Sequence, residues 1–425
     1  MVANQRKTQL DSLVDRGSPI CYGILKPGED CPTGIPVIKV KNIQGGGVSQ
    51  DKLLRTTPEI HEKYRRSEVK EGDLLLTIRG TIGRVAIVPK SLDGANITQD
   101  TVRIRVSSED DPLYVFYALQ CPQVQRKIEL NTVGQAVKGI NVAEVRKLEV
   151  FHPSGAEQKN IVQILSVWDK AITATERLLF NSHEQKEALI QQLLTGNRRL
   201  SREDKKFGLK KTTFGYIPAD WEYPKIDVIC SQLLEKNISG ADYPVLSCSK
   251  HAGFVDSLKY FKKRVYSEDT SGYRVIPKDC FGFPANHIEE GSIGLQKIYE
   301  IGLVSPIYVV FVADQEKVNN DYLYALLKTE HYRQVFSAAT NSSVDRRGSL
   351  RWKEFSSIHV PLPPLKEQNE IAAVIAIADK EIEALKSKLK CIKEEKNALM
   401  QQLLTGNLRV KMNGVAQNTQ EISEI

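Results

Sequence analysis

The chain has 425 residues, which is enough for two or three packed domains of ordinary size. Hydrophobic residues make up 41% of it and charged residues 26%, and no stretch approaches the roughly 18 consecutive apolar residues of a membrane-spanning helix, so we expect a soluble protein. The net charge of +7 fits a polyanionic partner without requiring one.

The opening residues, 1–17, lack the apolar core of a secretory signal, and we expect a cytoplasmic protein. Its seven cysteines would then be reduced thiols. They are scattered singly, without a C-x-x-C pair or a histidine cluster nearby, so the sequence predicts neither a metal site nor a redox motif.

An internal repeat organises the chain. Residues 157–200 align without gaps on residues 367–410, with roughly twenty identities, and both copies contain the string QQLLTGN. The preceding segments correspond more loosely, in one order and at a near-constant offset. The matched strings are Pro36-Val37-Ile38 with Pro244-Val245-Leu246, Gly80-Thr81-Ile82-Gly83 with Gly291-Ser292-Ile293-Gly294, and Tyr117-Ala118-Leu119 with Tyr324-Ala325-Leu326.

Both repeated segments predict a long helix with a coiled-coil seam. In the second copy the apolar residues alternate in steps of four and three, and the first copy follows the same register, interrupted by Thr175 and Ser182. The seam residues are Ile161, Leu165, Trp168, Ile172, Leu179, Leu189 and Leu193 in the first helix, and Ile371, Ile375, Ala378, Ile382, Leu385, Leu389, Ile392, Leu399 and Leu403 in the second.

The helix ends are marked by a capping-box spacing at 154–157, by Pro363-Pro364, and by Gly196 and Gly406, which suit a left-handed cap. About 38 residues at about 1.5 Å each give a rod on the order of 55 Å long. The first helix must deliver the chain to a second globular part, and the second helix returns if it packs on the first. We therefore expect an antiparallel pair related by a pseudo-two-fold axis.

The two globular segments predict mixed α and β domains, so the fold class is α+β. Each has short β-type runs followed by an amphipathic helical stretch. The runs are Pro36–Val40, Asp73–Ile78, Val85–Val88 and Thr101–Val106 in the first segment and Tyr243–Leu246 and Leu303–Val312 in the second, and the helical stretches are Leu113–Ile128 and Tyr322–Phe336.

Basic, amide and hydroxyl side chains interrupt these strands at their ends. Arginine and lysine neutralise phosphates or bind guanine, and an amide can pair with adenine, so as a set on loops these residues predict contacts with DNA. The candidates are Lys39, Lys41, Asn42, Arg65, Arg66, Arg79, Thr81 and Lys138 in the first segment, and Lys250, His251, Lys262, Lys263, Arg264, Asn286, Ser292, Arg346, Arg347 and Arg351 in the second.

Catalytic motifs are missing. The sequence has no P-loop, no glycine-rich cofactor loop after a strand, and no spaced carboxylates with a lysine that would predict a metal nuclease. His61-Glu62 and His183-Glu184 lack the second histidine of a zinc protease. We therefore expect no catalytic or metal-binding residue in this chain.

The sequence resembles the specificity subunits of Type I restriction-modification enzymes over nearly its whole length. The motifs that carry the resemblance are residues 361–368, PLPPLKEQ, the QQLLTGN helix end seen twice, and residues 217–221, IPADW. In the first segment, residues 34–38, 72–75 and 79–83 look like the target-recognition domains of that family, as do Ser305-Pro306, Tyr308 and Trp352 in the second. One departure is that residues 151–158, FHPSGAEQ, lead into the first helix without a proline run.

The resemblance implies a domain order: 1–153, first target-recognition domain; 154–200, first spacer helix; 201–362, second target-recognition domain with its lead-in; 363–410, second spacer helix; and 411–425, a flexible tail. It further implies that each domain reads one half of a split DNA site, that the helices set the unread spacer, and that two methyltransferase subunits, and possibly two restriction subunits, assemble on the chain. S-adenosylmethionine, ATP and magnesium would belong to those partners. Because the matched helices suit identical partners and the diverged domains suit different half-sequences, we expect an asymmetric target.

Two alternatives stay open from the sequence. One is a stand-alone DNA-binding regulator dimerised by its coiled coil, and the other is an adaptor whose domains bind proteins and no nucleic acid. The duplication argues against the regulator, because a regulator normally gains its second domain by dimerising, whereas this chain carries both.

Overall fold

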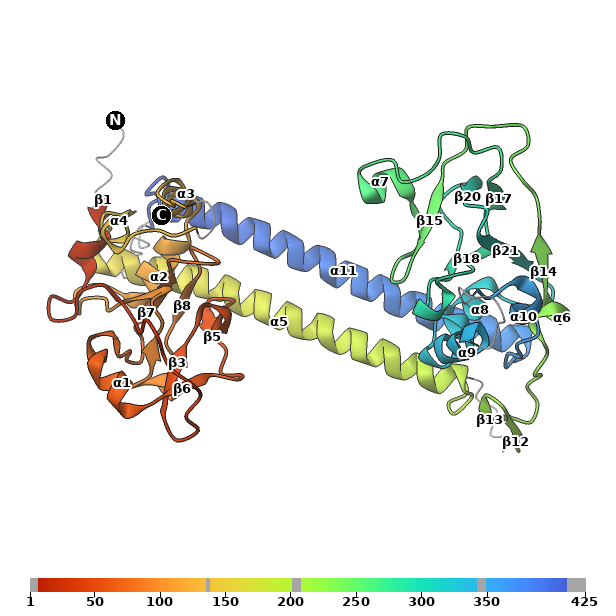
Figure 1. The fold of residues 1–425 in the computed structure, drawn as a ribbon, viewed down its shortest axis with the longest axis horizontal. Coiled ribbons are helices and arrows are strands. Elements are labelled where there is room, and N and C mark those ends of the chain that lie inside the picture. The colour runs from red at the N-terminus through yellow and green to blue at the C-terminus, as the bar shows by residue number, and fades with distance from the viewer. Residues whose placement is uncertain (1–6, 135–137, 201–207, 342–348, 411–425) are drawn as a thin grey trace, which may run out of the picture. The chain divides into compact units, whose positions relative to one another are not determined.

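The computed structural model describes residues 7–134, 138–200, 208–341 and 349–410. The predicted tail at 411–425 and two of the candidates, Arg346 and Arg347, lie outside these ranges. The chain forms two compact units, Met1–Arg177 with Ser387–Ile425, and Leu178–Lys386. Each unit contains one globular domain and a part of both long helices (Figure 1).

The two long helices are α5, Gly155–Leu194, and α11, Leu365–Leu403. The other elements of the first unit are β1 Lys7–Gln9, β2 Cys21–Tyr22, β3 Ile35–Ile38, β4 Ile43–Gln44, β5 Gly47–Val48, β6 Leu54–Thr56, α1 Pro58–Lys63, β7 Leu74–Thr77, β8 Val85–Ile87, β9 Asn96–Ile97, β10 Thr101–Ile104, α2 Pro112–Gln120, α3 Pro122–Leu130, α4 Val142–Arg146 and β11 Glu149–Phe151. Those of the second unit are β12 Leu209–Thr212, β13 Gly215–Pro218, α6 Ile226–Ile229, β14 Cys230–Leu233, β15 Leu246–Ser249, β16 Gly253–Asp256, α7 Ser257–Phe261, β17 Arg274–Pro277, β18 Phe281–Pro284, β19 Gly294–Leu295, β20 Ile301–Val304, β21 Tyr308–Ala313, α8 Asn320–Leu327, α9 Glu330–Asn341 and α10 Trp352–Ser356.

The central sheets of the two units have the same topology. The strand order is β2-β10-β7-β8 in the first unit and β14-β21-β18-β19 in the second, and all the pairings are antiparallel. In each unit the apolar face of this sheet packs against two short helices and a stretch of the long helices, which forms the main core. The predicted α+β fold and its internal repeat are therefore confirmed.

The sheet register corrects one predicted correspondence between the repeats. Ile87 of β8 and Leu295 of β19 both lie opposite the first residue of their central strand. Counting back four residues from each aligns Gly83 with Gly291, whereas the sequence comparison had matched Gly83 with Gly294. That match is wrong because the loop before β19 is longer than the loop before β8.

Several predicted elements are divided by prolines or turns. The helical stretch 113–128 is two helices, because Pro122 cannot continue α2 and instead opens α3. The stretch 322–336 is likewise divided between α8 and α9. The predicted strand Leu303–Val312 is two strands, β20 and β21, separated by a turn in which Tyr308 N donates to Ser305 O over 2.9 Å. The predicted strand at 243–246 begins only at Leu246.

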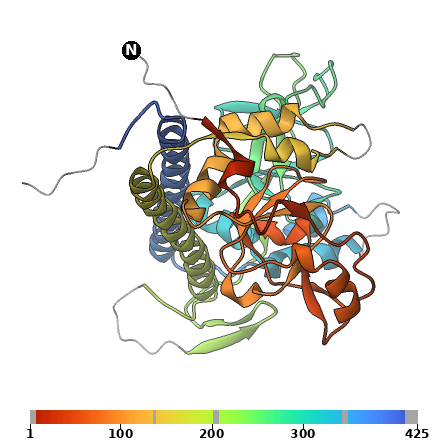
Figure 2. The same cartoon turned by 90° about the vertical axis from the view of Figure 1, so that its left-hand side faces the viewer.

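In each unit the long helices run antiparallel, as predicted. In the first unit, Asp169 contacts Lys396 and Glu176 contacts Lys393, so residue numbers rise along α5 as they fall along α11. Figure 2 shows the two helices side by side, next to the domain of the first unit. In the second unit Ser182 contacts Glu381 and Lys186 contacts Asp379, so the direction is the same. All sixteen predicted seam residues are buried or half-buried.

The lead-ins to the two long helices are equivalent in structure although they differ in sequence. Gln158 Nε2 donates to Pro153 O over 3.2 Å, and Gln368 Nε2 donates to Pro363 O over 2.8 Å. At the first lead-in, Glu157 N donates to Ser154 Oγ over 3.4 Å, which is one half of the predicted capping box.

The long helices end on glycines in the left-handed conformation. Gly196 has φ +71° and Gly406 has φ +77°, as predicted from the sequence. A Cβ atom on Gly406 would lie 2.7 Å from the ring of Phe151, so this position excludes a side chain by contact as well as by conformation. Among the helices within the described ranges, none combines the length and the apolar content needed to cross a membrane.

Candidate nucleic-acid interface

The loop between β7 and β8 is held in one shape by side-chain hydrogen bonds. Thr77 Oγ1 donates to Thr81 O over 2.6 Å and accepts from Arg84 N over 2.9 Å. From α3, Gln125 Nε2 donates to Gly83 O over 3.0 Å. A loop fixed at both its ends presents its side chains in a defined direction, which sequence-specific binding requires.

Arg79 leaves this loop at a position fixed by the neighbouring backbone. Ile78 N and Arg79 N both donate to Asp100 O, over 2.8 and 3.3 Å, and Ile140 N donates to Ile78 O over 3.0 Å. The side chain is exposed and borders a hollow of about 440 Å³. The other residues lining the hollow are Tyr22, Leu25, Ile78, Gln99, Val133, Gly139, Ile140, Asn141 and Val142.

Predicted candidates from three parts of the chain meet around this hollow. The guanidinium of Arg66 lies 5.7 Å from the centroid of the Tyr22 ring, and Lys138 precedes Gly139, whose backbone pairs with that of Arg79. The described lining residues include no carboxylate. Arg65 forms an exposed ion pair with Glu62, at 3.3 Å, and does not line the hollow. The hollow therefore combines cations, amides and an exposed aromatic ring, a composition that suits a nucleic acid.

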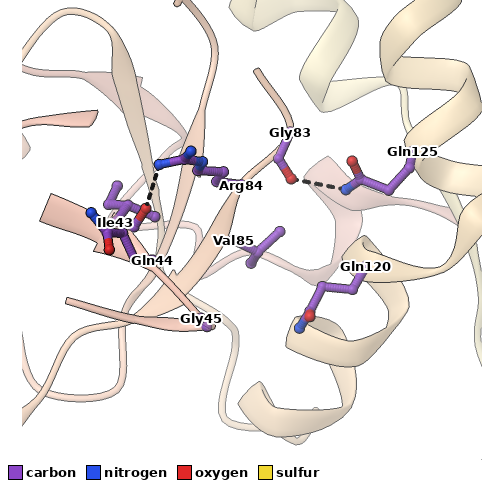
Figure 3. Close-up of a pocket in the computed structure, with 9 residues that line it drawn as sticks. Ile43, Gln44, Gly45, Gly83, Arg84, Val85, Gln120 and Gln125 are labelled. Carbon is purple, nitrogen blue, oxygen red and sulfur yellow. Dashed lines mark hydrogen bonds between the residues drawn. The ribbon is translucent and has the colours of Figure 1, made fainter. Parts of the chain in front are cut away.

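A second hollow, of about 650 Å³, is lined by Gly83, Arg84 and Val85 at the end of the same loop (Figure 3). Arg84 borders it and donates from Nη1 to Ile43 O over 3.0 Å, and Gln44, Gln120 and Gln125 line it as well. Sequence reasoning missed these residues. The signal available was an arginine directly after the second glycine of the loop, but the three glutamines come from segments that only the fold brings together.

Near this hollow the predicted candidates divide into exposed and buried residues. Lys41 is exposed, and its carbonyl oxygen accepts from Gln44 Nε2 over 2.9 Å, whereas Lys39 is half-buried. Asn42 is only 3% exposed, and its amide accepts from Lys39 N over 3.1 Å and donates to Asp51 O over 3.4 Å. Asn42 therefore braces the turn after β3, and the prediction that it contacts bases is corrected. The candidate Thr81 is exposed on the loop.

In the second unit, Asn286 lies in the loop between β18 and β19. Ala285 N donates to Ile307 O over 3.3 Å, and Leu350 N donates to Ala285 O over 2.8 Å, the same arrangement that precedes Arg79 in the first unit. Arg351 follows Leu350 directly and is exposed. Ser292, predicted to contact DNA from this loop, is buried at 6% exposure, so that assignment is also corrected.

Lys250 and His251 are exposed on the turn between β15 and β16 and border a hollow of about 850 Å³. Lys328 reaches into the wall of this hollow, where its Nζ donates to the carbonyl oxygens of Lys250 and Gly291 over 2.6 and 2.8 Å. Burial lowers the pKa of Lys328 from its ordinary value. Carboxylates also line this hollow, so its charge is mixed, unlike that of the hollow beside Arg79.

Three predicted cations follow α7. Lys262, Lys263 and Arg264 are all exposed, and Lys262 adopts a left-handed conformation with φ 53°. The guanidinium of Arg264 lies 5.1 Å from the centroid of the Tyr266 ring. Tyr260 and Phe261 are exposed on α7, so this segment offers cations and aromatic surface together.

Within the described part of the chain, one group of side chains could hold a metal ion. His287, Glu289 and Glu290 bring their ligand atoms within 4.8 Å of one another in the loop that carries Asn286. His287 Nδ1 lies 3.4 Å from Glu290 Oε1, which is an ordinary ion-pair distance at an exposed surface. The prediction that the chain binds no metal remains a prediction.

Comparisons with known proteins agree with this arrangement. The model of the family described as "Type I restriction modification DNA specificity domain" matches residues 26–179 and 220–394. The specificity subunit of the Type I restriction enzyme EcoBI from Escherichia coli is 28% identical over 236 residues, which are 54% of this chain and 46% of that protein. The MjaVIII specificity subunit from Methanocaldococcus jannaschii is 25% identical over 364 residues, 81% of this chain and 80% of that protein.

Solved structures show the same fold. The S subunit of a Type I restriction-modification system from M. genitalium superposes with a TM-score of 0.52 at 16% identity and covers 95% of this chain and 98% of that one. The HsdS subunit from Thermoanaerobacter tengcongensis gives a TM-score of 0.51 at 15% identity over 96% and 98% of the two chains. Since the family model matches both repeats and most of the sequence, this chain belongs to the Type I restriction-modification DNA specificity family.

Proposed function

We propose that this chain reads an asymmetric bipartite DNA sequence, each unit contacting one half-site. The observation that carries the proposal is that one sheet topology presents different side chains in the two units: Arg79 follows Ile78 in the first, and Asn286 follows Ala285 at the equivalent place in the second. A shared frame with different reading residues is what two unlike half-sites require.

The long helices would set the number of base pairs left unread between the half-sites. Both helices contribute residues to both units, and both are continuous, with 40 residues in α5 and 39 in α11. Because a helix lengthens by about 1.5 Å per residue, their length would define the spacer.

We further propose that two methyltransferase subunits bind this chain, and that two restriction subunits can join them. Membership of the family confirms the predicted class, a non-catalytic specificity subunit. S-adenosylmethionine, ATP and magnesium would then be bound by the partners, and the complex would act on DNA in the cytoplasm. The matched helical repeats support a pair of identical partners, because equivalent surfaces recur 210 residues apart.

A domain exchange tests the bipartite reading. Residues 1–150 are replaced by the same region of another specificity subunit of known target, and the methylated sequence is mapped across the host genome. We expect one half-site to change and the other to stay. A change in both halves would contradict the modular reading.

Co-purification separates the remaining alternatives. A methyltransferase that co-purifies with the chain supports the proposal, a free DNA-binding homodimer supports a regulator, and a failure to bind DNA supports an adaptor. In each unit the helix seam is filled by α5 and α11 of one chain, so the coiled coil needs no second copy, which favours the specificity subunit over the dimeric regulator.

A further inference from the structure

Arg79 and Asn286 occupy one position of the duplicated frame. The last pair between β7 and β10 joins Thr77 to Thr101, and the last pair between β18 and β21 joins Pro284 to Tyr308. Two residues beyond Thr77 the chain reaches Arg79, and two residues beyond Pro284 it reaches Asn286.

Two backbone contacts of the preceding residue are the same in both units. In the first unit, Ile78 lies between Asp100, whose oxygen accepts from its N–H, and Ile140, whose N–H donates to its oxygen. In the second unit, Ile307 and Leu350 make the same two contacts with the residue before Asn286. The two side chains therefore start from equivalent points of the backbone.

We infer that Arg79 and Asn286 are the matched base-reading residues of the two units, and that Arg79 selects guanine while Asn286 selects adenine. This inference rests on the proposed function. Arginine donates two parallel hydrogen bonds to O6 and N7 of guanine, and asparagine pairs with N6 and N7 of adenine. One half-site should thus contain a guanine where the other contains an adenine.

The surroundings of Arg79 favour a base edge over a phosphate. Among the described residues no carboxylate forms an ion pair with Arg79, so its guanidinium donors are available. Tyr22 and Leu25 line the same hollow and are 41% and 52% exposed. Apolar surface of this kind suits base edges and the thymine methyl group.

The amide of Asn286 has an unmet hydrogen-bonding requirement. Its Oδ1 is buried and has no hydrogen-bond donor among the described residues. The amino group at N6 of adenine would supply a donor for this oxygen. Since Oδ1 is covered in the structure, the side chain must rotate outward to meet the base, which is an ordinary change for a side chain on binding.

The test is selection from a randomised duplex pool by the full chain, as wild type and as Arg79→Asn and Asn286→Arg. Arg79→Asn should lower the preference for guanine over adenine at one position of one half-site about ten-fold or more, and leave the other half-site unchanged. Asn286→Arg should replace adenine by guanine in the other half-site. Arg16→Asn is the matched control, because Arg16 is an exposed arginine near Val14, which pairs with Val106 beyond the other end of β10.

A second variant separates base reading from phosphate binding. Arg79→Lys keeps the positive charge but loses the planar fork, so it should relax the selected sequence while retaining most of the affinity. If both Arg79 variants select the wild-type sequence, with affinity lowered equally for all duplexes, the inference is overturned and Arg79 binds a phosphate. If the wild-type chain selects no bipartite sequence, the proposed function fails first. Circular dichroism melting of each variant checks that the fold is retained.

Discussion

Lys396 of α11 lies 2.5 Å, from Nζ to Oδ1, from Asp169 of α5, and the same pairing recurs 210 residues away between Lys186 and Asp379. Both lysines occupy the same position of the repeated helix, between the apolar seam residues. Tyr117 OH also donates to Asp169, over 2.6 Å, and burial raises the pKa of this tyrosine. A lysine in an apolar seam needs such a partner, and only one register of the two helices provides it.

Lys396→Ala should lower the free energy of unfolding by about 1–2 kcal/mol. The Lys396 side chain is 12% exposed and its partner Asp169 is 42% exposed, so the loss is smaller than for a fully buried pair. Thermal and denaturant melting measure it. Lys390→Ala is the control on the same helix. The Lys390 side chain is exposed, and its Nζ lies as far as 3.9 Å from the nearest carboxylate oxygen of Glu394, so this ion pair is weak. The control substitution should change the free energy of unfolding by less than about 0.5 kcal/mol. Equal effects of the two substitutions would mean that the seam ion pair contributes nothing.

Gly406→Ala should destabilise the first unit more than Gly45→Ala does. Both glycines have positive φ, +77° and +57°, so each substitution costs about 1–2 kcal/mol of backbone strain. A Cβ on Gly406 would also meet the Phe151 ring at 2.7 Å, whereas a Cβ on Gly45 would meet nothing within 4 Å. The difference in denaturation midpoint between the two variants measures that contact, and no difference would show that the ring can move aside without cost.

The stabilising contribution of Asp220 should disappear in acid. Arg199 donates two hydrogen bonds to this carboxylate, over 3.0 and 2.9 Å, and lowers its pKa below the ordinary value of 3.8. An acid whose pKa is lowered by folding stabilises the folded state above its unfolded pKa and loses that contribution as the pH falls through the folded pKa. The stability difference between wild type and Asp220→Asn should thus be present at neutral pH and vanish progressively below about pH 3.8. A difference that persists in acid would rule out the ionised carboxylate as its source.

Seven residues inserted into each long helix, at the matched points after Arg177 and Lys386, should lengthen the unread spacer. Seven residues keep the heptad register and add about 10 Å of helix, which corresponds to about three base pairs of duplex. Mapping of methylated sites reads out the spacer. The control is a seven-residue substitution of exposed positions that leaves the length unchanged. If the insertion variant kept a spacer of the original length, the helices would not set the number of unread base pairs.

The sequence alone was enough to predict the internal repeat and the helices that connect the two domains. The duplication, the two long helices and their seam are encoded in heptad spacing and in identities 210 residues apart, and antiparallel pairing follows from the order in which one chain must connect its parts. The exposed candidates on the loops, Arg79 among them, were found because basic residues beside glycine turns stand out without knowledge of the fold.

The tertiary structure decided which residues are equivalent and which can be reached. The sequence cannot tell whether the amide of Asn42 faces solvent or stabilises a turn. The tertiary structure shows that this residue is only 3% exposed. The match of Arg79 with Asn286 depends on strand register across pairs far apart in the sequence, which short-range patterns do not encode. Helix periodicity repeats within a few residues and is visible in the sequence, whereas the shape of a binding surface depends on long-range contacts that exist only after folding.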